Sequence, residues 1–144
     1  MHFAIIMLFF GILQHKVVRP LYAEKVSVPS ELIAALIAHE SKGDDYAVGD
    51  RHLANKAYGC LQVRQSCVDD VNRRFGTKYR AEDCLGNREL SISICVMYLQ
   101  IYATPSRLGH KPTAEDFARI WNGGPNGWKK ESTVKYWAKV KKFL

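Results

Sequence analysis

The chain has 144 residues, a length typical of one globular domain. Hydrophobic residues make up 47% and charged residues 24%, which excludes disordered, collagen-like and low-complexity chains. The formal net charge of +7 favours an anionic partner such as nucleic acid, a membrane surface or a charged wall polymer.

The N-terminal segment is predicted to be a signal peptide. Residues 3–13 form an apolar run that is too short to span a membrane and has the length of a signal-peptide h-region. Ala23 offers a small residue at a cleavage point, so we expect a leader over 1–23 and a mature domain over 24–144. Because no Lys or Arg precedes the run, an uncleaved anchor or an N-terminal helix stays open as an alternative. Export would place the protein in the periplasm, outside the cell or at the cell envelope.

Five helices are predicted along the rest of the chain. Caps, apolar periodicity and glycine stops place them at 30–41 with Ser30 as N-cap, 65–75, 87–102, 113–124 and about 132–144. The 87–102 helix is apolar all round, which is typical of a buried central helix. The polar, glycine-containing stretch 42–59 is predicted to be a loop or a small hairpin. The fold class is therefore all-α, with at most one small β element.

Four cysteines follow the first predicted helix: Cys60, Cys67, Cys84 and Cys95. An even number in an exported chain allows two disulfides, for which three pairings exist. The spacings match no Cys-x-x-Cys metal or redox pattern. Disulfide bonding or simple burial is therefore favoured over zinc binding.

Glu40 is the most informative residue of the first predicted helix. The apolar stripe of this helix consists of Leu32, Ile33, Leu36 and Ile37. At about 100° per residue, Glu40 falls near the middle of that stripe and faces the interior or a cleft. Burial there would raise its pKa, and a carboxyl that keeps its proton near neutrality suits a general acid. The structural alternatives are a frayed helix end or a pair with a buried arginine.

A second carboxylate is expected near Glu40, because glycosidic bond cleavage commonly uses two. The loop after the helix offers Asp44, Asp45 and Asp50. Asp44 and Asp45 follow a glycine, so the shaping of a turn would be enough to explain them, although a catalytic role stays open for each. Asp50 lies farther along and can face Glu40 from the opposite wall.

Four sequence blocks resemble those of the lysozyme-like superfamily. They are HES at 39–41, YGCLQV at 58–63, FARIWNGGPNG at 117–127 and STVKYW at 132–137. The resemblance covers about residues 30–144. The four blocks are most similar to those of the invertebrate-type lysozymes and their bacterial relatives. Lytic transglycosylases share these signals more loosely. Since the invertebrate-type enzymes are rich in disulfides and this chain has four cysteines, the bacterial relatives are the better comparison.

The resemblance implies roles for particular residues. Glu40 matches the catalytic acid, and Asp50 lies one residue from the position of the second carboxylate. The residues that match the sugar-binding cleft are Gly59, Gln62, Asn122, Gly123 and Gly124. Tyr102 on the central helix is a further substrate-binding candidate. The tryptophans can stack on sugars, although aromatic residues more often serve as core.

Three functions follow as hypotheses. The first is a glycosidase that cuts peptidoglycan glycan strands at the MurNAc–GlcNAc bond. The second is a lytic transglycosylase with one catalytic glutamate, which would form 1,6-anhydro ends. The third is a non-catalytic wall-binding module. We expect a monomer without metal or organic cofactor. Nucleic-acid binding is not expected, since no helix-turn-helix pattern or arginine-rich arm occurs.

Overall fold

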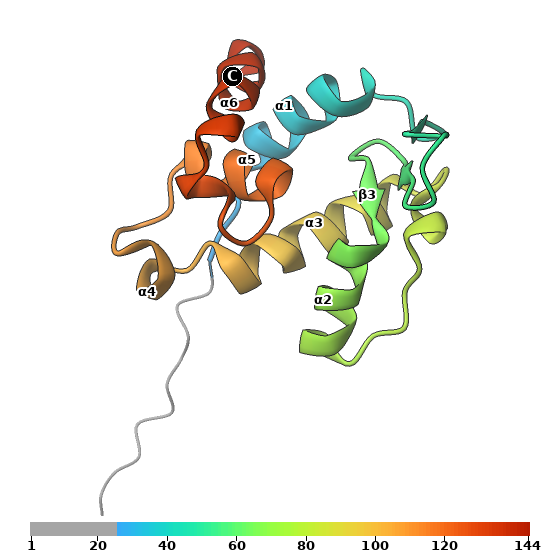
Figure 1. The fold of residues 1–144 in the computed structure, drawn as a ribbon, viewed down its shortest axis with the longest axis horizontal. Helices are drawn as coiled ribbons and strands as arrows, with labels where there is room; N and C mark the ends of the chain where they lie inside the picture. Colours follow the sequence, from blue (N-terminus) through green and yellow to red (C-terminus); the bar gives the residue numbers. More distant parts are fainter. Residues whose placement is uncertain (1–25) are drawn as a thin grey trace, which may run out of the picture.

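The computed structural model describes residues 26–144, so the predicted leader over 1–23 lies outside the described residues. Within them the fold is mainly α-helical with one very small sheet, as expected (Figure 1). The helices are α1 (Ser30–Ser41), α2 (Gln65–Phe75), α3 (Arg88–Tyr102), α4 (Pro105–Leu108), α5 (Ala114–Gly123) and α6 (Val134–Val140). Four 3-10 turns complete them: η1 (Ala81–Cys84), η2 (Gly127–Lys129), η3 (Glu131–Thr133) and η4 (Lys141–Phe143). No helix of this part of the chain is long and apolar enough to cross a membrane.

Local sequence signals explain most helix ends. Helix α2 stops at Gly76, whose φ of 69° is left-handed and costs a glycine little. Helix α5 begins with the predicted capping box, in which Thr113 and Asp116 each accept from the other's backbone N–H. The predicted cap of α1 was displaced by one residue, because Pro29 takes the N-cap position and Ser30 is already helical.

The stretch after α1 forms a three-stranded antiparallel sheet. Its strands are β1 (Val48–Gly49), β2 (Ala57–Tyr58) and β3 (Val63–Arg64), in the order β1-β2-β3. The hairpin within 42–59 was expected. The third strand was not, because two residues are too few to show a period-two pattern.

Helix α3 is the centre of the domain. Its residues Ile94, Cys95 and Leu99 are fully buried, and α2 and α5 pack against it. In Figure 1, α1, α5 and α6 lie on one side of α3, while α2 lies on the other and β3 leads into it. The prediction of a buried central helix is confirmed, and α3 joins the two groups of elements that bear the site.

The C-terminal segment is more broken than predicted. Where one helix was expected over 132–144, η3, α6 and η4 follow one another. The hydroxyl of buried Thr133 lies 2.7 Å from the carbonyl oxygen of Gly127, which ties the start of this segment to the preceding turn. Helix α4 was not predicted, since four residues give no periodic signal.

All four cysteines are free thiols in the structure, so the expected disulfides are not confirmed. Cys60, Cys84 and Cys95 are buried and Cys67 is half-buried. Burial raises the pKa of each thiol, that of Cys84 to about 11. Cys60, Cys84 and Cys95 therefore act as small apolar core residues, and Cys67 packs against that core.

Candidate active site

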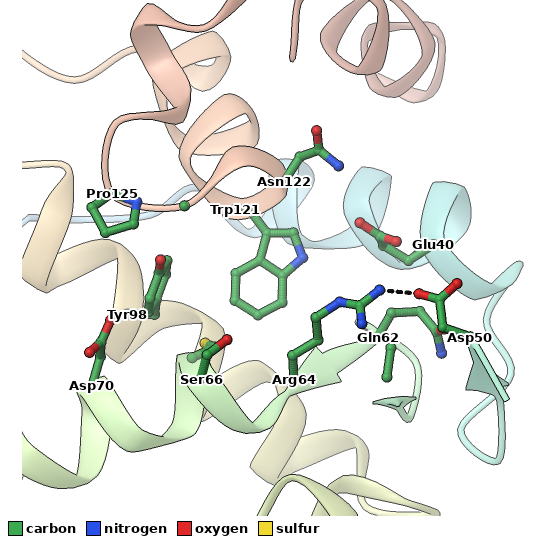
Figure 2. Close-up of a pocket in the computed structure, with 13 residues that line it drawn as sticks. Glu40, Asp50, Gln62, Arg64, Ser66, Asp70, Tyr98, Trp121, Asn122 and Pro125 are labelled. Atoms are coloured by element: carbon green, nitrogen blue, oxygen red, sulfur yellow. Dashed lines mark hydrogen bonds and ion pairs between the residues drawn. The ribbon is translucent and has the colours of Figure 1, made fainter. Parts of the chain in front are cut away.

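A cleft of about 410 Å³ lies between the two groups of elements (Figure 2). Its walls come from α1, the sheet, α2, α3, α5 and the turn after α5. The residues that line it are Glu40, Asp50, Ala57, Gln62, Arg64, Ser66, Cys67, Asp70, Tyr98, Trp121, Asn122, Gly124 and Pro125. In Figure 2 the charged groups Glu40, Asp50 and Arg64 gather at one end, with Trp121 between them and Asp70.

Glu40 lies in the last turn of α1 with its carboxyl in this cleft. The phenol of Tyr136, from α6, donates a hydrogen bond of 2.6 Å to its Oε1. Burial raises the pKa of Glu40, and this effect outweighs the opposite effects of the Tyr136 hydrogen bond and the Arg64 charge. Since Oε1 is already engaged as an acceptor, Oε2 is the oxygen free to carry a proton towards a ligand.

Asp50 lies in the same cleft and forms an ion pair with Arg64 from β3. The other guanidinium nitrogen, Nη1, donates to the carbonyl oxygen of Asn55 at 2.6 Å. Arg64 therefore ties two residues of the β1–β2 loop, Asp50 and Asn55, to β3. The site brings together a partly buried carboxyl with a raised pKa and a carboxylate–guanidinium pair.

Two lining residues have backbone conformations that non-glycine residues rarely adopt. Asp50 has a φ of 50° and Gln62 a φ of 53°, both in the left-handed region. Such strain collects at functional sites. The amide nitrogen of Gln62 donates to the carbonyl oxygens of Gly59 (3.0 Å) and Ala47 (3.4 Å), so this side chain braces the loop while lining the cleft.

An aromatic wall forms the middle of the cleft. Tyr98 meets Trp121 edge-on, with ring centroids 5.9 Å apart and an interplanar angle of 82°. Behind it, Tyr102 contacts Tyr98 with centroids 4.9 Å apart. These edge-on contacts favour one orientation of each ring, and the Trp121 indole lines the cleft in front of the two tyrosines.

Three predicted site residues do not line the cleft. Gly59 is buried with a φ of 73°, and a Cβ there would lie 2.5 Å from the carbonyl oxygen of Cys84, so close packing explains this glycine. Gly123 is set by packing too, because its Cβ would meet the Thr133 methyl at 2.5 Å. The Tyr102 hydroxyl is held by Asp70 at 2.8 Å and stands behind the wall.

Sequence reasoning missed several lining residues, and a signal existed for some of them. Arg64 gave none, because β3 is only two residues long and Gln62 before it lies in a turn with a left-handed φ. Ser66 and Cys67 lie four and three residues before Asp70, a spacing that places each of them beside Asp70 on the helix surface. Tyr136 left no such signal, because its partner Glu40 lies 96 residues away along the chain.

Comparison with known proteins agrees with this geometry. The chain belongs to the lysozyme-like superfamily that the sequence blocks indicated. The inhibitor-bound lysozyme from Meretrix lusoria superposes with a TM-score of 0.68 at 24% identity, over 80% of this chain and 89% of that one. At this identity the likeness establishes the fold.

The Transglycosylase SLT domain family matches residues 21–142, and the chain belongs to this family. Among curated proteins, the lysozyme of Magallana gigas is 31% identical over 91 residues, covering 62% of this chain and 63% of that protein. The lysozyme of Meretrix lusoria is 45% identical over 92 residues, covering 63% of this chain and 70% of that one. The match thus spans less than two thirds of the length of the Magallana gigas lysozyme.

Proposed function

We propose that this protein is a glycosidase of the lysozyme type that cleaves the MurNAc–GlcNAc bond of peptidoglycan glycan strands, with Glu40 as general acid. One observation carries this proposal: the Glu40 carboxyl lies in the cleft with a raised pKa and one oxygen free. The kinship with named lysozymes supports it. Because peptidoglycan lies outside the cytoplasm, the proposal includes export of the protein. We further propose that the enzyme acts as a monomer without a metal or an organic cofactor.

The first step of the reaction is proton transfer from Glu40 to the glycosidic oxygen. As the bond between C1 and this oxygen breaks, the leaving sugar takes the proton and positive oxocarbenium character develops at C1. Glu40 is left as a carboxylate, which the Tyr136 hydroxyl stabilises by the hydrogen bond to Oε1. The Trp121 indole offers a face on which a sugar ring can stack.

Asp50 is the proposed second carboxylate. Its pairing with Arg64 keeps it oriented towards the end of the cleft that holds Glu40. There it would stabilise the oxocarbenium charge, form a glycosyl intermediate or activate the water that completes hydrolysis. Water then adds its hydroxyl to C1 and its remaining proton returns to a carboxylate.

A lytic transglycosylase is the second candidate, and membership of the SLT family favours it. In that reaction the 6-hydroxyl of the same sugar attacks C1, and Glu40 first donates and then accepts a proton. The ion pair with Arg64 also favours it, because a paired Asp50 is less available as nucleophile. Mass analysis of the released fragments separates the two reactions: hydrolysis gives reducing ends, and transglycosylation gives 1,6-anhydro ends.

The test of the proposal is turbidity clearing of purified cell wall by Glu40→Gln. We expect clearing to fall by at least about a hundredfold, because loss of a general acid costs roughly 10²–10⁴ in rate. Glu31→Gln, an exposed change in the first turn of the same helix, serves as the matched control and should clear normally. A wall-binding module would sediment with wall and never clear it. Full clearing by Glu40→Gln would refute the proposal.

A further inference from the structure

The lysines of the chain differ from its arginines in their partners. Within residues 26–144, every ion pair to a carboxylate is made by an arginine or by His110, and none by a lysine. Residues 129–144 carry six lysines and a single acid, Glu131. Lys139, Lys141 and Lys142 are exposed near the end of this segment, and together they form what we call the C-terminal cationic surface.

An apolar groove of about 710 Å³ lies beside this surface. Helix α1, the start of α3 and η4 border it, and η4 and α6 both pack on α1. Its lining residues are Ala34, Ile37, Ala38, His39, Lys42, Gly43, Arg88 and Phe143. None of them lines the cleft that holds Glu40, so the groove is a separate site.

Two large apolar side chains are exposed where the groove meets the cationic surface. Phe143 is 53% exposed and Leu144 is 56% exposed. The Phe143 ring centroid lies 6.5 Å from that of His39, at the wall of the groove. Single exposed apolar residues are ordinary on protein surfaces, but here they adjoin both an apolar groove and unpaired lysines.

The rim of the groove is also positive. Lys42 follows α1 and makes no ion pair with any residue of the described part of the chain. Arg88 lies at the start of α3 and forms an ion pair with Asp45. Lys139 is near enough to His39 to help lower the pKa of that imidazole, in addition to the effect of burial. Three elements therefore supply cations around one apolar depression.

We propose that the C-terminal cationic surface and the α1–Phe143 groove form a docking site for a bilayer surface that contains anionic lipids. The lysines would meet the headgroup phosphates, while Phe143, Leu144 and the groove would take up the apolar part of the interface. A soluble polyanion would need only the lysines, so the groove and the exposed Phe143 favour the lipid. The cleft shares no residue with this site and stays open to a polymer chain.

Vesicle co-sedimentation tests this site without reference to activity. The probes are vesicles of phosphatidylglycerol and phosphatidylcholine in equal amounts, and vesicles of phosphatidylcholine alone. The cationic variant combines Lys139→Gln, Lys141→Gln and Lys142→Gln. Its matched control removes the same charge elsewhere with Lys56→Gln, Lys78→Gln and Lys111→Gln. Since all variants share one N-terminal segment, differences between them report on the surface.

We expect binding to the anionic vesicles to weaken about fivefold for each lysine removed, hence about a hundredfold for the cationic variant. Binding by the charge-matched control should weaken by less than about tenfold. Phe143→Ser should weaken binding severalfold, whereas Phe75→Ser, at a phenylalanine that is 43% exposed at the end of α2, should not. Equal losses in the cationic variant and its control would overturn the proposal, because binding would then follow net charge alone. Binding of Phe143→Ser to the anionic vesicles at the wild-type level would overturn the proposal in favour of a simple polyanion site.

Discussion

Replacement of Tyr136 by phenylalanine removes one hydroxyl from the site and keeps the ring. That hydroxyl donates the 2.6 Å hydrogen bond to Oε1 of Glu40. The ring itself contacts His39 edge-on, with centroids 4.9 Å apart, and this packing survives the substitution. The change therefore isolates the hydrogen bond.

The expected effect follows from the charge of Glu40 along the reaction. A hydrogen bond to a neutral carboxyl contributes about 0.5–1.5 kcal/mol and one to a carboxylate about 1.5–3 kcal/mol. Because Glu40 gives up its proton in the transition state, the bond is stronger there by about 1–1.5 kcal/mol. Its loss should lower kcat about five- to tenfold. It should also raise the pKa of Glu40, since the Tyr136 bond favours the charged form.

The assay is the pH dependence of kcat/KM for wall clearing, whose alkaline limb reports the pKa of the free enzyme's acid. Tyr136→Phe should move this limb to higher pH. Tyr46→Phe, which changes a side chain that is 71% exposed, should leave the limb and the rate unchanged. An alkaline limb that stays in place or moves to lower pH in Tyr136→Phe would refute the reasoning.

Three further predictions concern the other parts of the site and its support. Asp50→Asn should cut kcat by at least about tenfold if Asp50 is the second carboxylate, whereas wild-type turnover would favour the single-glutamate mechanism. Burial alone would raise the pKa of Asp116, but hydrogen bonds from Thr113 and His110 lower it overall. The Asp116 carboxylate should therefore contribute fully to the free energy of unfolding above the pKa of the unfolded carboxyl, and this contribution should disappear as the pH falls through the pKa of the folded protein. Urea unfolding of Asp116→Asn at a series of pH values should not show this decrease. Gly127→Ala should lower the free energy of unfolding by about 1–3 kcal/mol, because its Cβ would lie 1.9 Å from a backbone oxygen; unchanged thermal unfolding would contradict the packing described.

The sequence predicts the features of this protein that are local. Helix α2 has its predicted bounds because Gly76 stops it, and α5 lies within one residue of its predicted bounds because Thr113 and Asp116 cap it. The placement of Glu40 in a cleft follows from the stripe on α1, since a helix has one fixed angle per residue.

What could not be predicted depends on contacts between distant residues. The partners of Glu40 and Asp50 come from α6 and β3, and no pattern in the chain relates their positions. Gly59 and Gly123 were assigned to the cleft from the motifs that contain them. Close packing against Cys84 and Thr133 accounts for both glycines, and a motif does not distinguish packing from ligand approach.

The most direct test is an NMR titration of the Glu40 carboxyl carbon in the wild-type protein, with the resonance assigned by its absence in Glu40→Gln. We predict a titration midpoint above the ordinary glutamate range, moving still higher in Tyr136→Phe. A midpoint within or below that range would mean that Glu40 holds no proton to donate at the pH of the reaction, and would contradict the assignment of Glu40 as the acid.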